Sequence, residues 1–247
     1  MSNSLNKSQI ERFSRQLILK NVGAKGQKKV ISSKILIIGV GGLGCPAAEN
    51  LTRAGIGTIG LVDNDVVNLS NIHRQSLFNS RDIKKSKVSV AAKKLKDINP
   101  HTKIKTYNIR LNEKNIKNII QNYDIVIDGS DNFKTKFLIN DYCLKFKKKL
   151  VTGAISKFDG HIFTFDFKDK KTASLKNFYQ EKEISDDILN CEFDGVLGTT
   201  ASIVGSIQAN EALKMTIEIG QNLKNQILII DLLNLNFRKV KFKKQKL

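Results

Sequence analysis

Short apolar runs alternate with longer amphipathic stretches along the first two thirds of the chain. The runs KILIIGV, TIGLVDND, KIKTYNI, YDIVIDGS and LVTGAI have the length and apolar content of buried strands. Apolar residues at helical spacing predict helices over 43–54, 84–98, 113–121 and 133–146. Strands that alternate with helices form right-handed crossovers, so we expect a mostly parallel sheet with helices on both faces.

The two ends of the chain depart from this alternation. Apolar residues at helical spacing, with Ser8 as N-cap, predict a helix over 8–20. Alternating apolar residues on both sides of Gly160 predict an antiparallel hairpin, and a helix over 199–219 and two closing strands, QILIIDLL and FRKVKF, follow. We expect one domain over 1–247 with an α/β, Rossmann-like, doubly wound sheet and added antiparallel strands. Residues 168–194 are expected to form a polar crossover loop that acts as a lid.

The charge of the chain is strongly positive. The sequence has 42 Lys plus Arg against 23 Asp plus Glu, a formal net charge of +19. Lysines scattered along helices and tails favour a solvated surface over a nucleic-acid-binding stripe, because no aromatic residues interleave with them. The three cysteines form no C-x-x-C pair, so neither zinc nor a disulfide framework is expected. The N-terminus has no secretory signal pattern, and a reducing cytoplasm is the simplest compartment.

A glycine-rich turn follows the first predicted strand. GVGGLG supplies Gly39, Gly41, Gly42 and Gly44 before a helix, where backbone N–H groups favour phosphate. Asp63 ends the next strand, in the position of a carboxylate that accepts hydrogen bonds from ribose hydroxyls. These features fit a nicotinamide cofactor as well as ATP, so an NAD-dependent oxidoreductase remains an alternative.

Polar residues farther along favour phosphate chemistry. Asn71, Arg74 and Gln75 follow the acidic strand end, and Lys87 lies near a helix start. Cations of this kind neutralise a polyphosphate as it is attacked. Asp128 and Asp131 end another parallel strand, where a carboxylate suits Mg²⁺ that bridges phosphate oxygens. A non-enzymatic, basic nucleic-acid-binding module is the second alternative.

An ordered series of motifs resembles the MoeB/ThiF/HesA family, bacterial relatives of ubiquitin-activating enzymes. The series is RFSRQ, GVGGLGCPAAENLTRAGIGTIGLVDND, LSNIHRQ, KSKV, DGSDN, VTGAI and GVLGTTASIVGSIQANEALK. The resemblance implies an ATP-dependent adenylyltransferase. Its substrate would be the C-terminal glycine of a small ubiquitin-like sulfur carrier, MoaD-like or ThiS-like, and pyrophosphate would be released. It also implies a role in molybdenum cofactor (molybdopterin) or thiamine biosynthesis.

The resemblance also implies roles for individual residues. Arg74 and Lys87 match phosphate-binding cations, and Asp131 matches the carboxylate that positions Mg²⁺. Arg15 resembles an arginine that reaches the ATP of a neighbouring subunit, which implies a homodimer with shared sites. The nucleotide-binding positions are Gly39, Gly41, Gly42, Gly44, Asp63, Asp65, Asn71, Gln75 and Asn132.

Cys191 and the missing zinc pairs leave two questions open. Thiamine-branch relatives form a covalent sulfur linkage at the position of Cys191, whereas molybdopterin-branch relatives carry a cysteine there without needing it. Family members commonly have two C-x-x-C pairs for zinc, and this sequence has none, so we expect ATP and Mg²⁺ but no zinc. We expect no rhodanese-like extension, and we therefore expect a separate protein to donate sulfur.

Overall fold

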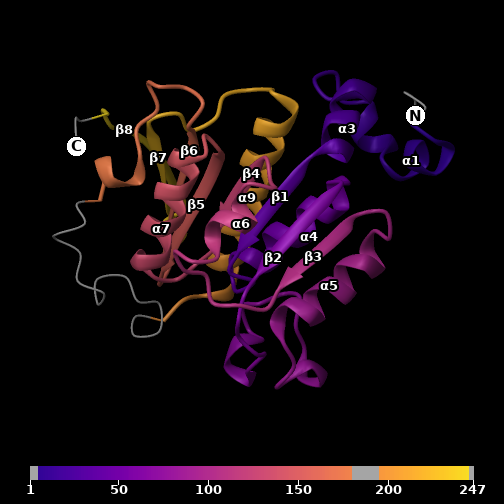
Figure 1. Ribbon diagram of the computed structural model, residues 1–247, viewed down its shortest axis with the longest axis horizontal. Helices are drawn as coiled ribbons and strands as arrows, with labels where there is room; N and C mark the ends of the chain where they lie inside the picture. The colour runs from indigo at the N-terminus through magenta and orange to yellow at the C-terminus, as the bar shows by residue number, and fades with distance from the viewer. Residues whose placement is uncertain (1–4, 180–194, 245–247) are drawn as a thin grey trace.

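The computed structural model describes residues 5–179 and 195–244, which contain an eight-stranded sheet (Figure 1). Its strands are β1 (Lys34–Ile38), β2 (Thr58–Val62), β3 (Lys103–Tyr107), β4 (Ile125–Asp128), β5 (Lys149–Ser156), β6 (Asp159–Asp166), β7 (Gln226–Asp231) and β8 (Asn236–Lys241). The order is β3-β2-β1-β4-β5-β6-β7-β8, with β3 to β5 parallel and the remaining pairs antiparallel. The predicted fold class is confirmed.

Helices cover both faces of the sheet and bury its apolar strands. One core lies against α3 (Gly23–Ser32), α4 (Gly44–Ala54), α5 (Lys87–Ile98) and α9 (Gly198–Ile217). The other lies against α6 (Ile116–Ile120) and α7 (Phe133–Lys145). Burial on two faces explains why β1 and β4 read as continuous apolar runs rather than alternating ones. Within the described part of the chain, no helix is both long and apolar enough to cross a membrane.

The strand order reverses between β1 and β4. From β1 the chain goes to β2 and β3 on one side, then returns to place β4 on the other side of β1. The loops that leave the carboxyl ends of β1 and β4 therefore diverge and leave a crevice between them. Open α/β sheets bind their ligands at such a switch point.

The N-terminal segment differs from the prediction. In place of one helix over 8–20, the structure has α1 (Lys7–Arg12) and α2 (Ser14–Leu17), separated at Phe13. Phe13 is buried against Gly55, where an added Cβ would lie 2.4 Å from the ring. Packing of this ring at the amino edge of the sheet interrupts the helix. Helix α3 is a further element that the sequence pattern does not predict. The N-terminal helices and β8 lie at opposite ends of the long axis (Figure 1).

Two further boundaries need correction. The β5–β6 turn lies at Lys157 and Phe158, and Gly160 lies inside β6. Helix α5 begins at Lys87 rather than at residue 84, because the preceding residues pair with the strand-like segment at Val66.

The expected polar loop is also partly packed. Leu175 is buried in the 3-10 helix η3 (Leu175–Asn177), and Phe178 and Tyr179 pack edge-to-face against Phe163. Packing of these side chains therefore fixes residues 175–179 on the sheet. The remainder of the predicted lid, 180–194, lies outside the described residues.

Candidate functional site

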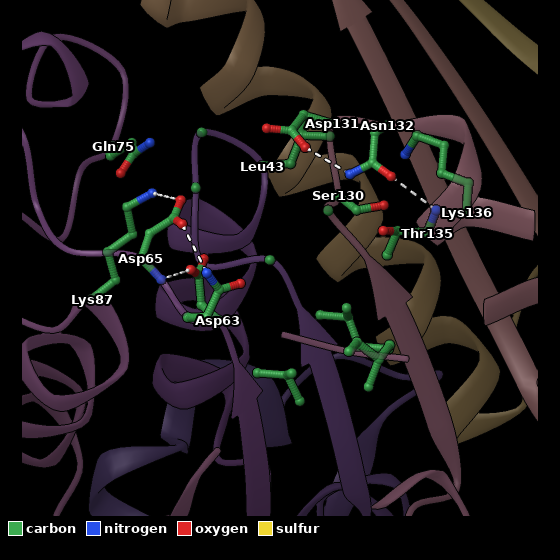
Figure 2. A pocket seen from close by; sticks show the side chains of 18 of the residues that line it. Leu43, Asp63, Asp65, Gln75, Lys87, Ser130, Asp131, Asn132, Thr135 and Lys136 are labelled. Atoms are coloured by element: carbon green, nitrogen blue, oxygen red, sulfur yellow. Dashed lines mark hydrogen bonds and ion pairs between the residues drawn. The ribbon is translucent and has the colours of Figure 1, made fainter. Parts of the chain in front are cut away.

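A cavity of about 440 Å³ lies at the carboxyl ends of β1, β2 and β4, at the switch point (Figure 2). Its lining residues come mainly from the loops that follow these three strands: Gly39, Gly41, Gly42, Asp63, Asp65, Asn71, Arg74, Gln75, Lys87, Arg110, Ser130, Asp131, Asn132, Thr135 and Lys136 are among them. The volume is in the range of small-molecule sites. Strands far apart in sequence thus bring most of the predicted site residues together.

Two glycines make the turn after β1 possible. Gly39 has φ +86°, and a Cβ there would lie 2.7 Å from the carbonyl oxygen of Gly129. A Cβ on Gly44 would lie 1.9 Å from the carbonyl oxygen of Gly39. Gly44 does not line the cavity, so its structural contribution is the close approach of α4 to the turn.

Asp63 joins the acidic strand end to the glycine turn. Its Oδ2 accepts a hydrogen bond from the backbone N–H of Val40 at 2.7 Å, and its Oδ1 accepts one from Asp65 N–H at 2.8 Å. Burial raises the pKa of Asp63, while Lys87 and the two N–H donors oppose that rise. The carboxylate is thereby oriented beside the turn and can still accept further hydrogen bonds from a ligand.

Lys87 and Asp65 form an ion pair on the same wall (Figure 2). Lys87 Nζ lies 2.8 Å from Asp65 Oδ2, and the Lys87 N–H donates to the Asp65 carbonyl at 3.0 Å. The Lys87 side chain is 6% exposed and that of Asp65 is 57% exposed. A mostly buried ammonium therefore has an exposed, exchangeable counter-ion.

Arg74 and Gln75 contribute polar groups that lack strong partners. Arg74 Nη1 donates to the Ser70 carbonyl at 2.8 Å and contacts His73 Nε2 at 2.8 Å. Within 5–179 and 195–244, Arg74 forms no ion pair. Gln75 Oε1 is buried and has no hydrogen-bond partner among the described residues. An orphaned buried acceptor and an unpaired guanidinium fit a ligand with both donors and anionic groups.

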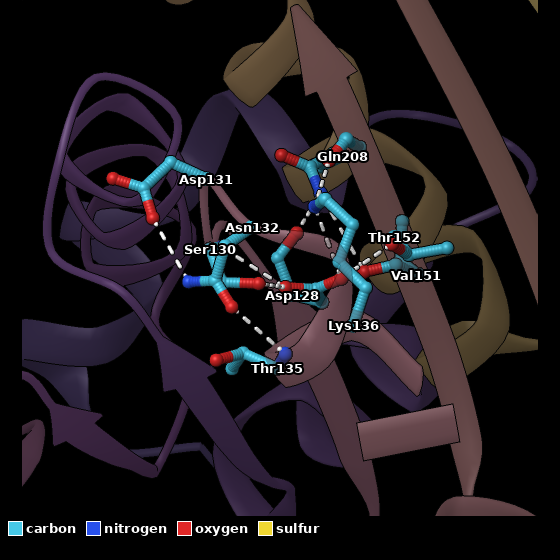
Figure 3. A network of polar contacts seen from close by, with 10 residues as sticks. Asp128, Ser130, Asp131, Asn132, Thr135, Lys136, Val151, Thr152 and Gln208 are labelled. Atoms are coloured by element: carbon cyan, nitrogen blue, oxygen red, sulfur yellow. Dashed lines mark hydrogen bonds and ion pairs between the residues drawn. The ribbon is translucent and has the colours of Figure 1, made fainter. Parts of the chain in front are cut away.

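The opposite wall contains two aspartates with contrasting surroundings (Figure 3). Asp128 is fully buried, and its carboxylate accepts hydrogen bonds from Ser130, Lys136 and Thr152. Asp131 is exposed, and among the described residues its side chain has one hydrogen-bond partner, Asn132 Nδ2 at 3.1 Å. Asp128 is therefore saturated, whereas Asp131 has open coordination positions.

Asn132 begins helix α7. Its Oδ1 accepts from the Thr135 N–H at 2.9 Å, which makes it the N-cap. Its Nδ2 donates to Asp131, so the cap and the open carboxylate are linked. Asn132 also lines the cavity, so capping leaves its predicted contact with nucleotide possible.

Besides Gly44, two of the predicted residues are not brought to the cavity or lie outside the described residues. Arg15 lies in α2 at the amino edge, where neighbouring Gln16 donates to the Ala54 carbonyl, so it does not line the cavity of its own chain. Cys191 lies outside the described residues.

Sequence reasoning missed Arg110 and Lys136. Arg110 follows β3, and the shared carboxyl edge of parallel strands was a signal that could have identified it. Lys136 is 5% exposed, one turn into α7, and no sequence pattern marked it as a buried lysine.

The site residues fit magnesium with phosphate, and the buried thiols do not fit catalysis. Mg²⁺ is commonly held by one or two carboxylates together with substrate phosphates, an arrangement for which Asp131 is suitable. The described residues contain no group of three or more His, Cys, Asp or Glu that could hold a metal alone.

Burial raises the pKa of the Cys45 thiol to about 12, and burial also raises the pKa of Cys143. Neither thiol is therefore an activated nucleophile.

Comparisons with known proteins agree with this geometry. Residues 13–247 match the family described as "ThiF family". A probable molybdopterin-synthase adenylyltransferase from Gracilaria tenuistipitata var. liui is 38% identical, over 97% of this chain and 67% of that protein. A sulfur carrier protein adenylyltransferase from Thermus thermophilus is 36% identical, over 95% of this chain and 88% of that protein.

Other relatives are longer or more distant. An adenylyltransferase and sulfurtransferase MOCS3 from Drosophila virilis is 40% identical over 98% of this chain, which spans only 54% of that protein. The crystal structure of PaaA has a TM-score of 0.82 at 20% identity, over 99% of this chain and 77% of that one. At this identity the likeness to PaaA shows the fold alone.

Proposed function

The chain belongs to the ThiF family, and we propose that it is an ATP-dependent adenylyltransferase that activates the carboxyl-terminal glycine of a ubiquitin-like sulfur-carrier protein. The resemblance inferred from sequence motifs is confirmed by the family match. Relatives named as adenylyltransferases of molybdopterin synthase or of a sulfur carrier support this activity over a nicotinamide-dependent or nucleic-acid-binding one.

The single observation that carries the proposal is the set of groups around the switch-point cavity. It combines a glycine turn, an oriented carboxylate at Asp63, and the cations Arg74 and Lys87 on one side. The open carboxylate of Asp131 lies on the other side. Hydride transfer needs neither clustered cations nor an open carboxylate, whereas attack on a polyphosphate needs both charge neutralisation and metal positioning.

In the proposed reaction the carrier's terminal carboxylate oxygen attacks the α-phosphorus of ATP. A carboxylate–phosphorus bond forms, the bond between the α-phosphorus and the bridging oxygen breaks, and pyrophosphate leaves with the electron pair. No proton has to move and no protein nucleophile is required. Arg74, Lys87 and Arg110 would stabilise the charge on the phosphates, and Asp63 would hold the ribose.

Magnesium, when bound, would neutralise phosphate charge and orient the leaving group. Asp131 is the residue of this chain that would hold it. The carboxylate is exposed and, within 5–179 and 195–244, accepts one side-chain hydrogen bond, from Asn132, so it fits that task. Gln75 Oε1, buried without a partner among the described residues, would accept a hydrogen bond from the bound nucleotide.

This chain has exposed apolar residues beside the cavity to which the carrier would dock. Val196 lines the cavity, and the next residue, Leu197, is 50% exposed. Phe158, Leu233 and Leu235 are also exposed, and the β7–β8 turn is joined to Phe158 by a backbone hydrogen bond to its carbonyl oxygen. An apolar surface contiguous with the cavity supports docking of a folded carrier whose tail enters the site.

A homodimer with shared sites would explain the position of Arg15. Helix α2 lies at the amino edge, while the cavity lies at the carboxyl edge, so Arg15 would act only in a partner's cavity. Ile18 and Leu19 are exposed beside it and offer apolar contact to a second copy. Mixing inactive Arg15→Ala with inactive Asp131→Asn should restore activity through one intact site per mixed dimer, and no recovery after proven subunit exchange would contradict shared sites.

The pathway and the sulfur chemistry are part of the proposal. The carrier would serve molybdenum cofactor or thiamine biosynthesis in the cytoplasm, and another protein would donate sulfur. If the thiamine-branch chemistry applies, Cys191 would form the covalent sulfur linkage after adenylation.

ATP–pyrophosphate exchange tests the activity. Purified enzyme with ATP and Mg²⁺ should exchange labelled pyrophosphate only when a carrier with its terminal glycine is present. A carrier that lacks this glycine is the matched control. Exchange without any carrier, or protection from thermal unfolding by NAD rather than by ATP–Mg²⁺, would contradict the proposal.

A further inference from the structure

A buried carboxylate lies directly behind the open one. Asp128 is 0% exposed, and Asp131 follows three residues later, where the loop enters α7. The Oδ1 atom of Asp128 accepts from the Ser130 N–H at 2.9 Å and from the Ser130 hydroxyl at 2.6 Å. Its Oδ2 accepts from the Thr152 hydroxyl at 2.5 Å. Asp128 therefore organises the turn that presents Asp131.

Lys136 supplies the positive charge for this carboxylate (Figure 3). Its Nζ lies 3.2 Å from Asp128 Oδ2 and donates to the Gly153 carbonyl at 2.6 Å. Both side chains are almost completely buried, at 6% and 1% exposure. The ammonium thus connects the first turn of α7 to the carboxyl end of β4 and to the middle of β5.

Helix α9 completes the enclosure from behind. Gln208 is fully buried, and its Nε2 donates to the backbone carbonyl of Asp128 at 2.8 Å. The Asp128 backbone and carboxylate are thus both fixed, by groups from three different elements. These hydrogen bonds and the ion pair rigidify the surroundings of Asp128, although Gln208 Oε1 has no hydrogen-bond partner among the described residues.

Stability alone gives little reason for such an ion pair. Removing two charges from water costs about as much as their attraction returns, so buried pairs are often no better than apolar residues of the same volume. The same pair does have a geometric effect, because it fixes both ends of the segment 129–135, which comprises the loop 129–132 and the first residues of α7. Asp131 and Asn132 lie in the middle of that segment, and Asn132 links Asp131 to the start of the helix.

We propose that Lys136 is a positioning residue for adenylation: clamped between Asp128 and the Gly153 carbonyl, it fixes the start of α7 so that the Asp131 carboxylate is presented to the metal-bound polyphosphate. This inference rests on the proposed function. Lys136 acts through Asp128 and the loop, and its ammonium is already engaged by two acceptors.

The experiment compares Lys136→Met and Lys136→Arg with the wild type. Lys134→Met is the matched control, because Lys134 is an exposed lysine on the same helix. Three quantities are measured: the Mg²⁺ concentration for half-maximal exchange, the binding of Mn²⁺ to enzyme with a non-hydrolysable ATP analogue by electron paramagnetic resonance, and metal-free ATP affinity by calorimetry.

Lys136→Met is expected to weaken Mn²⁺ binding and raise the Mg²⁺ requirement by about tenfold, as for other residues that orient metal ligands. Metal-free ATP affinity should change little, because the substitution does not alter the glycine turn or the wall that contains Asp63, Arg74 and Lys87. Lys136→Arg should restore most of the metal affinity, and Lys134→Met should behave as wild type. Equal Mn²⁺ affinity in Lys136→Met and wild type would overturn the proposal, as would equal losses of metal-free and metal-dependent ATP binding.

Thr152→Val keeps the test valid if Lys136→Met does not fold. This change removes one hydrogen bond to Asp128 without leaving a buried charge unpaired. Weaker Mn²⁺ binding in Thr152→Val supports the proposal, and unchanged binding overturns it. Wild-type enzyme without carrier-dependent exchange would reject the proposed function itself, whereas normal exchange with an unchanged metal requirement in the variants would reject only the positioning role.

Discussion

The two walls of the cavity hold their charges differently. On the wall after β2, Lys87 pairs with an Asp65 side chain that is 57% exposed, and Arg74 has no carboxylate partner among the described residues. On the wall after β4, Asp128 and Lys136 form an almost completely buried pair, whereas the Asp131 carboxylate is exposed.

This contrast distinguishes the groups that contact a ligand from the groups that hold the ligand-binding residues in place. An exposed counter-ion binds weakly, so a phosphate can replace it at little cost. A buried pair cannot exchange, because removal of either partner leaves an unpaired charge in the interior. The wall after β2 is thus suited to bind phosphate groups whose charge changes during the reaction. The wall after β4 is suited to keep the Asp131 carboxylate in place.

Asp131→Asn should have the largest effect on activity. We expect carrier-dependent exchange to fall by about a thousandfold, because the variant loses the charge that would hold the metal. The free energy of unfolding should change by less than about 0.5 kcal/mol, since the side chain is exposed. Exchange kinetics and urea unfolding measure both. Near-normal exchange would show that the open carboxylate is not needed.

Asp128→Asn, unlike Asp131→Asn, should have a large effect on stability. Loss of the buried carboxylate leaves Lys136 unpaired and should lower the free energy of unfolding by about 3 kcal/mol. Urea denaturation measures this loss, and Asp131→Asn is the control. If the two variants are equally stable, the contrast between a buried and an open carboxylate is wrong.

Lys87→Met should lower exchange by about a hundredfold with little loss of stability, because the ammonium would neutralise phosphate charge in the transition state. The effect should appear in both kcat and kcat/KM. A variant affected only in KM for ATP would indicate that Lys87 contributes to ground-state binding alone.

Asp65→Asn should have the smallest effect. If Asp65 is mainly an exchangeable counter-ion of Lys87, ATP affinity should change by less than about threefold, as expected for a partly exposed pair. Calorimetry with ATP–Mg²⁺ measures the change. A loss of tenfold or more would instead make Asp65 a direct nucleotide ligand, as its family position implies.

Much of the first wall could be predicted from sequence, and much of the second could not. The glycine turn, Asp63 and the cations lie within short segments whose chemistry is visible in the order of residues. Asp128 and Asp131 were read as two similar carboxylates at a strand end. Their difference depends on Thr152 and Lys136, which reach the site through β5 and α7, and burial of that kind is set only by tertiary packing.

Local sequence patterns also failed to predict two features outside the parallel strands, the N-terminal helices and residues 175–179. The parallel strands were identified because burial on both faces leaves a continuous apolar run. The break at Phe13 depends on a pocket at Gly55, and the packing of residues 175–179 depends on aromatic rings from β6. Neither contact is between sequence neighbours, so local periodicity could not predict it.

The most direct test of adenylation is the intact mass of the carrier after incubation with enzyme, ATP and Mg²⁺. We predict that the carrier gains the mass of one adenylyl group at its terminal glycine, with pyrophosphate as co-product, and that Asp131→Asn enzyme leaves the mass unchanged. An unmodified carrier, or release of ADP and phosphate instead of pyrophosphate, would contradict adenylation at this site.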